Sequence, residues 1–213
     1  VRRSAARKRF RPSFFLTAYV TREEKPGGPR RAIAFDDDAQ DFLDSVEMKN
    51  VFAAVVKKAK RKFDVIGMDA CLMSMVETAM QVQQSGEVFC GSQEVEPGEG
   101  WPYDRILKQL AANPAMTGLQ LTKIIVKEFV ASYPTSMPVT QSAFELTRLS
   151  VVAKAADALG TLLAKALKNT DDLTLRGALA VAHNRSQGYE HKDYVDLWDF
   201  TQNLVSLWPA GAA

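Results

Sequence analysis

The 213-residue chain contains few cysteines, few histidines and no long apolar run. Two cysteines, Cys71 and Cys90, are too few for a disulfide framework, and their spacing matches no metal-binding motif. No apolar run approaches the roughly 18 residues of a membrane span, and the basic start of the chain is not followed by the apolar core of a signal peptide. These absences exclude a disulfide framework and a membrane span within this sequence, and we expect no membrane partner.

The two histidines point to no site of their own. Neither His183 nor His191 has a ligand-type partner at metal-binding spacing, and we predict no metal site from them. His183 stands in AVAHNRSQG, a stretch typical of a helix end, and we interpret it as a packing or surface residue. We interpret His191 as solvated.

Charge is distributed unevenly along the chain. Residues 1–31 contain ten of the 27 Lys and Arg but only two of the 25 Asp and Glu, which leaves residues 32–213 acidic. Basic arms of this kind bind nucleic acid, are simply solvated, or form exposed linkers open to proteolysis. Because no aromatic interleaving or recognition-helix pattern accompanies the charge, we predict no nucleic-acid partner.

Helical and strand patterns alternate through the first two thirds of the chain. An unbroken apolar run at about 63–68 is typical of a central parallel strand covered on both faces. A helix with an Asp44/Glu47 capping box precedes it at about 45–61, and a helix at about 72–84 and a strand in EVFCGSQEVE follow. This order predicts an α/β fold with a parallel-rich sheet. Further helices are expected at about 104–112, 118–131, 149–168, 171–186 and 196–207, and short strands in SFFLTAYV, RAIAF and PVTQSAFEL.

Cys71 is expected at the end of the strand at 63–68, where the next helix begins. Ligands of open α/β sheets bind beyond the carboxyl ends of strands, and a helix N-terminus favours a thiolate. Both features indicate a nucleophile. The alternative is a buried structural cysteine, which behaves as a small hydrophobe.

Asp69 is the second candidate, because an acidic side chain directed inward needs a cation. We expect Asp69 and Cys71 on the same side of the chain, since successive strand residues alternate. Asp69 then fits the floor of a pocket for a cationic substrate group, with capping of a helix at Cys71 or Leu72 as the alternative.

The next strand is expected to carry polar residues beside this pocket. Ser92, Glu94 and Glu96 alternate onto one face and fit a second acidic wall; the alternative is an edge strand with a solvated face. Trp101 and Tyr103, in the turn-rich loop PGEGWPY, either line a cleft or fill a core.

The run FDVIGMDACLMSMVETAMQVQQSGEVFCGSQEVEPGEGWPYDRIL resembles the clostripain family of cysteine peptidases, which belongs with caspases, legumains and gingipains. The likeness extends from RAIAFDDDAQDFL to YVDLWDF, about residues 32–205. It implies a caspase-like fold, Cys71 as the catalytic nucleophile, Asp69 at the base of the primary specificity pocket, and Ser92 and Glu94 lining that pocket. It also implies an endopeptidase that cleaves peptides and proteins after Arg or Lys and is secreted or held in the cell envelope.

The chain lacks the His-Gly motif that supplies the catalytic histidine in this clan. We therefore expect that histidine, with the first strands of the sheet, upstream of Val1 on a light chain released by self-cleavage. The expected domains are a basic linker and activation segment at 1–31, a caspase-like core at 32–148, and a helical extension packed on the core at 149–213. The alternative is an inactive relative, or an α/β binding module whose basic arm holds nucleic acid or acidic partners.

We expect no cofactor to be needed for the chemistry. The resemblance implies calcium as an addition, and the acidic residues Asp36, Asp37 and Asp38 offer oxygen ligands for it. An acidic turn is the other interpretation of these three residues.

Overall fold

The structure is a computed structural model that describes residues 14–17, 32–36, 38, 41–168, 173–190 and 193–208. The chain divides into two compact units, Val1–Leu149 and Ser150–Ala213. The first holds the sheet and the predicted site residues, and the second is helical. Most of the basic arm lies outside the described residues, so the three-part domain division stays a prediction.

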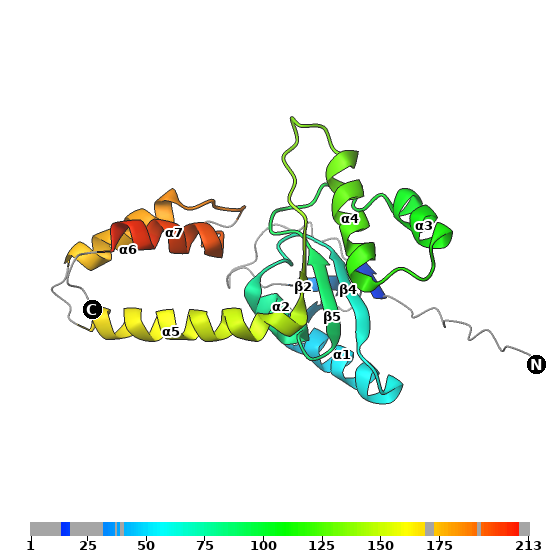
Figure 1. Ribbon diagram of the computed structural model, residues 1–213, viewed down its shortest axis with the longest axis horizontal. Helices are drawn as coiled ribbons and strands as arrows, with labels where there is room; N and C mark the ends of the chain where they lie inside the picture. The colour runs from blue at the N-terminus through cyan, green and yellow to red at the C-terminus, as the bar shows by residue number, and fades with distance from the viewer. Residues whose placement is uncertain are drawn as a thin grey trace, which may run out of the picture. The chain divides into compact units, whose positions relative to one another are not determined.

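A four-stranded sheet organises the first unit in the order β1-β4-β5-β6 (Figure 1). Its strands are β1 (Phe14–Thr17), β4 (Phe63–Asp69), β5 (Gly86–Gly91) and β6 (Ser142–Glu145). The first three run parallel, and β6 is antiparallel to β5. The predicted parallel-rich α/β fold is therefore confirmed.

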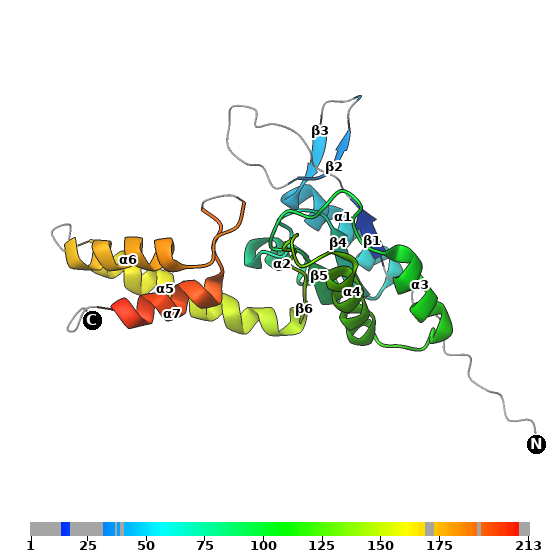
Figure 2. The same ribbon diagram turned by 90° about the horizontal axis from the view of Figure 1, so that it is seen from above.

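Helices cover both faces of this sheet, as Figures 1 and 2 show. On one face α1 (Ser45–Ala59) and α2 (Val76–Val82) pack against the sheet in a core that includes Phe52, Ile66, Met68 and Phe89. On the other, α3 (Tyr103–Ala112) and α4 (Gly118–Ser132) enclose Val65, Cys90, Trp101 and Ile125. Burial of β4 on both faces agrees with its unbroken apolar sequence.

Local signals explain where two of these helices begin. Asp44 accepts hydrogen bonds from the N–H groups of Val46 and Glu47, and Glu47 accepts one from the N–H of Asp44, so the predicted capping box starts α1. Thr117 and Gln120 form the equivalent box at α4. Beside it, Gly118 lies so close to β4 that an added Cβ would stand 2.5 Å from the carbonyl oxygen of Asp64.

Three element boundaries differ from expectation. Helix α2 begins at Val76 rather than near 72, and β5 ends at Gly91 instead of continuing through Glu96. Residues 41–44, where no strand was expected, form β3 (Asp41–Asp44), which pairs with β2 (Ala32–Asp36) as an antiparallel hairpin. The first two differences move the site residues from regular elements into loops.

The second unit consists of helices α5 (Leu149–Leu167), α6 (Leu173–Arg185) and α7 (Leu197–Leu207), which follow the short 3-10 turn η1 (Leu146–Arg148) of the first unit. Helices α6 and α7 pack on each other. Asp196 caps α7 by accepting a hydrogen bond from the N–H of Asp199. Within the described ranges, no helix is both long enough and apolar enough to cross a membrane.

Candidate active site

Two loops meet where the parallel strands β4 and β5 end. Residues 70–75 follow β4, and residues 92–101 follow β5. The N–H of Leu72 donates to the carbonyl oxygen of Glu94 at 3.2 Å, and the N–H of Ser74 donates to that of Ser92 at 2.8 Å. These bonds hold the two loops side by side at the carboxyl edge of the sheet, the usual place for ligands in α/β folds.

Cys71 lies in the first loop with a half-buried thiol. Its Sγ accepts a hydrogen bond from the N–H of Glu96 at 3.3 Å and lies 3.9 Å from the carbonyl oxygen of the same residue. The next residue, Leu72, has a φ of 60°, a left-handed conformation that costs free energy for a residue with a branched side chain. A constrained turn thus presents the thiol at the end of β4.

The thiol of Cys71 is not activated in this arrangement. Burial raises its pKa, and the negative charges of Glu96 and Glu94 add to the rise, against the lowering effect of the Glu96 N–H. The expectation that a helix N-terminus favours the thiolate was wrong, because α2 begins five residues later at Val76. A base from elsewhere must therefore take the proton before Cys71 can act as a nucleophile.

Asp69 is the last residue of β4 and is only 5% exposed. Its Oδ2 accepts hydrogen bonds from the N–H of Trp101 at 3.1 Å and from the hydroxyl of Tyr103 at 2.8 Å. Its Oδ1 is buried and accepts no hydrogen bond from any residue that the structure describes. The alternative that Asp69 caps a helix at Cys71 or Leu72 was wrong, since no helix begins there.

Glu96 lies between the other two residues. Its main chain contacts the thiol of Cys71, and its side chain, 8% exposed, lies against Asp69. Burial raises the pKa of Glu96, and a hydrogen-bond contact with Asp69 and the negative charge of Asp69 raise it further. The indole N–H of Trp101 lowers that pKa slightly, but neither oxygen of Glu96 has a partner in full hydrogen-bond geometry.

Ser92 and Glu94 are occupied within the second loop. The hydroxyl of Ser92, fully buried, donates to the carbonyl oxygen of Glu94 at 2.9 Å and contacts the hydroxyl of Thr140 at 2.9 Å. Thr140 also accepts from the N–H groups of Gln93 and Glu94. Because β5 has ended, the expected alternation of Ser92, Glu94 and Glu96 on one strand face was wrong.

The remaining residues considered from the sequence lie elsewhere. His183 is half-buried in the last turn of α6, and His191 lies outside the described residues. Cys90 is completely buried in β5, where burial strongly raises the pKa of its thiol. Asp37 also lies outside the described part, in which no group of three or more His, Cys, Asp or Glu side chains gathers as metal ligands.

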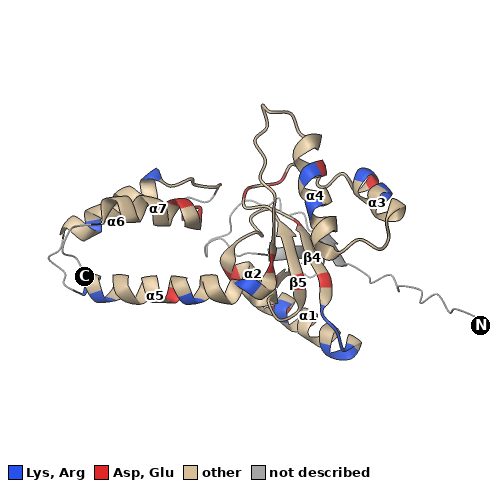
Figure 3. Ribbon diagram, viewed as in Figure 1, with Lys and Arg blue, Asp and Glu red and all other residues tan. Residues whose placement is uncertain are grey.

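Basic side chains concentrate at the opposite end of β4 from Asp69 (Figure 3). They belong to the last turn of α1 and to the turn between α1 and β4: Lys57, Lys58, Lys60, Arg61 and Lys62. Arg61 pairs with Asp64 at 3.5 Å, and the turn is otherwise open to solvent. The turn therefore supplies no basic side chain to the acidic residues of the two loops.

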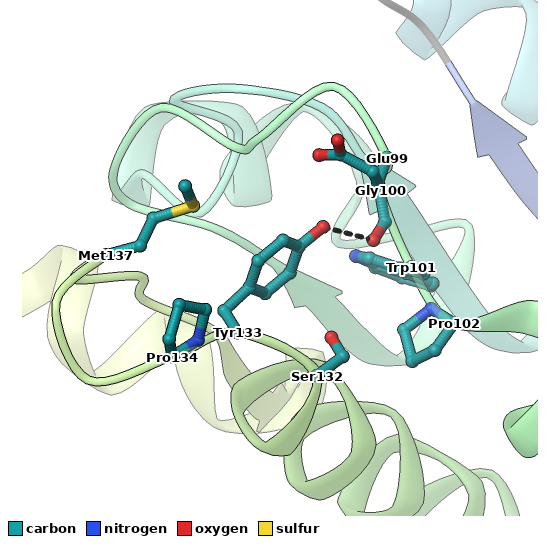
Figure 4. Close-up of a pocket in the computed structure, with 8 residues that line it drawn as sticks. All are labelled: Glu99, Gly100, Trp101, Pro102, Ser132, Tyr133, Pro134 and Met137. Atoms are coloured by element: carbon teal, nitrogen blue, oxygen red, sulfur yellow. Dashed lines mark hydrogen bonds between the residues drawn. The ribbon is translucent and has the colours of Figure 1, made fainter.

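A hollow of about 340 Å³ lies beside the second loop (Figure 4). It is lined by Glu99, Gly100, Trp101, Pro102, Ser132, Tyr133, Pro134 and Met137. The hydroxyl of Tyr133 donates to the carbonyl oxygen of Gly100 at 2.7 Å. Gly100 itself, with a φ of 62°, lies so close to Asp69 that an added Cβ would stand 2.8 Å from Oδ2. Residues 99–102 therefore border both the hollow and Asp69.

Three residues contribute more to this region than the sequence indicated: Glu96, Tyr103 and Thr140. Glu96 was not among the pocket residues that the resemblance implied, yet it is the one that contacts both Cys71 and Asp69. Tyr103 was assigned only to a cleft or a core, and Thr140 was not singled out. The motif PGEGWPY was the one available signal for Tyr103, whereas nothing in the local sequence indicates Thr140.

Comparisons with known proteins place the chain in a family. The family model described as the clostripain family, peptidase C11, matches residues 19–209. Among solved structures, a secreted C11 cysteine protease from Bacteroides thetaiotaomicron, in complex with an irreversible peptide inhibitor, is similar with a TM-score of 0.58 at 18% identity, over 90% of this chain and 51% of that chain. A second structure of a secreted C11 protease from the same organism, called iotapain, gives 0.58 at 18% identity over 92% and 55%.

A clostripain from Bacteroides thetaiotaomicron ATCC 29148, bound to the peptide inhibitor BTN-VLTK-AOMK, gives a TM-score of 0.51 at 18% identity over 76% of this chain and 68% of that one. The chain thus spans about half the length of the first two structures, and at these identities the likeness concerns the fold. No curated protein matches. Because the family model covers most of the sequence, this chain belongs to the clostripain family.

Proposed function

We propose that the protein is a cysteine endopeptidase that cleaves after Arg or Lys, with Cys71 as its nucleophile. One observation carries the proposal: a half-buried thiol at the carboxyl edge of the sheet lies next to two buried carboxyl groups that no described cation neutralises. Burying such groups is costly unless a positive charge meets them. A basic side chain of the substrate supplies that charge.

The specificity part of the proposal rests on Asp69. Its Oδ2 is fixed by Trp101 and Tyr103, which orients the carboxyl group, and its Oδ1 is left for a ligand. A guanidinium or ammonium group would bind there through charge-assisted hydrogen bonds. In support, the peptide part of the inhibitor bound to the Bacteroides clostripain, VLTK, ends in lysine. Ser92 and Glu94 support this pocket by holding the loop that carries Glu96.

The chemical step requires a partner for Cys71. The thiol, whose pKa is raised by burial, must lose its proton to a base before its sulfur attacks the substrate carbonyl. In the described part of the chain no histidine contacts the thiol, whose hydrogen bonds go to Glu96 alone. We assign the base to a histidine on a light chain, separated from this heavy chain by cleavage in the basic segment at 1–31. That histidine protonates the leaving amine and later activates water.

Secretion belongs to the same proposal, because two of the similar structures are of secreted proteases. Calcium binding by Asp36–Asp38 stays a prediction of the resemblance.

Cleavage of matched peptides tests the proposal. Three substrates that differ only in Arg, Lys or Leu before the scissile bond would be compared by kcat/KM. A charge-assisted contact to a buried carboxylate predicts a preference for Arg and Lys of about 100-fold. Cys71→Ala should abolish cleavage, while Cys90→Ala should leave it measurable. Equal rates on all three peptides, or an active Cys71→Ala variant, would reject the proposal.

A further inference from the structure

We propose that Asp69 and Glu96 act as one diacid, which holds a shared proton while the pocket is empty and releases that proton when an Arg or Lys side chain enters. The inference rests on the proposed function, since it concerns the same pocket. It adds Glu96 as a specificity residue and makes recognition of the substrate dependent on pH.

The geometry of the two side chains carries the inference. Asp69 and Glu96 are 5% and 8% exposed, and their carboxyl groups lie in hydrogen-bond contact with each other. Three of their four carboxyl oxygens accept no hydrogen bond of acceptable geometry from a described donor. These are Oδ1 of Asp69 and both oxygens of Glu96. Neither forms an ion pair with a described Lys, Arg or His. Buried acceptors without a described partner, beside a second carboxyl group, indicate a missing proton or a missing cation.

Electrostatics then favours a single proton on the pair. Two negative charges a few ångströms apart in a poorly solvated place repel each other, so that one carboxyl group keeps its proton and donates it to the other. The raised pKa of Glu96, caused first by burial and then by Asp69, agrees with this arrangement. The proton also limits the negative charge beside the Cys71 thiol, whose pKa the charge of Glu96 raises.

The other titratable groups around Glu96 supply no positive charge. The hydroxyl of Tyr103 comes from α3 and donates to Asp69, and the Cys90 thiol comes from β5. The remaining neighbours are acids as well, and they come from the loops and from the end of α4: Cys71, Glu94, Glu99 and Tyr133. No described residue supplies a cation that balances the pair, and we assign that role to the ligand.

An entering guanidinium or ammonium group takes over the role of the proton. Its N–H groups donate to Oδ1 of Asp69 and to the oxygens of Glu96, while Trp101 and Tyr103 keep Oδ2 in place. The proton leaves to water or buffer, and the pair, with two negative charges, binds one positive charge. No bond other than this O–H bond breaks, and no oxidant or reductant takes part.

Calorimetry on the whole chain tests this exchange. The probe is N-acetylarginine methylamide, with its neutral citrulline counterpart as control, titrated into the Cys71→Ser variant to prevent turnover. Titration in buffers of different ionisation enthalpy counts the protons released. We expect the release of about one proton per arginine ligand near neutral pH. The association constant should therefore increase by up to about tenfold for each unit by which the pH is raised towards neutral. Glu96→Gln, which keeps the shape of the side chain, should release close to none.

Each outcome decides the matter. If the arginine ligand binds more tightly than the citrulline ligand but wild-type and Glu96→Gln pockets release the same number of protons, proton sharing is wrong while the Arg/Lys pocket stands. If the two ligands bind alike, the pocket itself is wrong, and the proposed specificity fails with the inference. Should Glu96→Gln lower the unfolding midpoint, the titrations are made at a temperature at which both variants are folded, and the expected difference in proton release is unchanged.

Discussion

Asp69 holds the loop residues Trp101 and Tyr103, and we propose that it also binds the substrate; two substitutions separate these roles. Asp69→Asn keeps an oxygen for the Trp101 N–H and the Tyr103 hydroxyl but removes the charge. We expect kcat/KM on Arg and Lys peptides to fall about 100-fold, the equivalent of about 2 to 3 kcal/mol. The free energy of unfolding should change by less than about 1 kcal/mol.

Asp69→Ala is the contrasting variant, because it removes the acceptor of the buried Trp101 N–H and of the part-buried Tyr103 hydroxyl. Each unsatisfied donor costs about 1 to 3 kcal/mol, so unfolding should become markedly easier. An Asp69→Asn variant with full activity on Arg peptides would show that the carboxylate has only a structural role.

The two thiols should differ sharply in reactivity. In the folded chain by itself, iodoacetamide should modify the half-buried Cys71 but not the fully buried Cys90. Because burial raises the pKa of Cys71, its rate should be below that of a free peptide cysteine at neutral pH and should still be rising where the peptide rate has levelled off.

Mass spectrometry of the Cys71→Ser and Cys90→Ser variants measures each thiol separately. A Cys71 whose rate has already levelled off at a pH well below the pKa of a free thiol, as a stabilised thiolate would show, contradicts the absence of an activating base.

Glu96 should make the folded chain less stable in alkaline solution. Folding raises the pKa of Glu96. At a pH between its pKa in the unfolded state and its pKa in the folded state, the native state therefore binds more protons than the unfolded state. The free energy of unfolding therefore falls as pH rises, by at most about 1.4 kcal/mol per pH unit. Urea unfolding of the wild type and Glu96→Gln at about pH 5 and pH 8 measures this. If both lose the same stability, Glu96 is not the group responsible.

Among the elements, the contact of α4 with β4 depends on a single glycine. At Gly118 an added Cβ would stand 2.5 Å from a backbone oxygen of β4, so Gly118→Ala must push the helix away and should cost about 1 to 3 kcal/mol. Gly160, in α5, is the matched control, since no atom lies within 4 Å of its added Cβ. Gly160→Ala should stabilise by up to about 1 kcal/mol through helix propensity. Destabilisation by both, measured in urea, would contradict a steric cause.

Elements with a strong local signal were predicted well from sequence. The Asp44/Glu47 box marks the start of α1, and the unbroken apolar run marks β4. The start of α2 was missed because Leu72 and Ser74 bond to the loop after β5 instead of forming a helical turn. Such contacts join residues some 20 positions apart, and local propensity does not encode them.

The same reason limits prediction of the site. Cys71 and Asp69 stand in a recognisable motif, but the place of Glu96 depends on where β5 ends. That end is set by side-chain bonds from Ser92 and Thr140 to the loop backbone, which replace the strand ladder. Glu96 therefore reaches Asp69 from a loop, and its position does not follow from the alternation of side chains along a strand.

For the molecule as a whole, the proposed enzyme is complete only when a histidine joins Cys71. In our proposal the described chain supplies the thiol, the pocket and the loop that links them, and a second polypeptide supplies the base. The chain's coverage of about half of two similar secreted proteases agrees with further sequence taking part in the intact enzyme. Cleavage within the basic segment would connect the two chains as products of one precursor.

The first experiment we would do is covalent labelling of the protein isolated with every chain bound to it. A peptide chloromethyl ketone ending in Arg, with a Leu-ended analogue as control, would be followed by intact mass and peptide mapping. A single adduct on Cys71 from the Arg probe alone, accompanied by a light chain of upstream sequence, is the predicted result. Labelling by both probes alike, modification of Cys90 instead, or no adduct in the presence of the light chain would contradict a basic-specific cysteine peptidase.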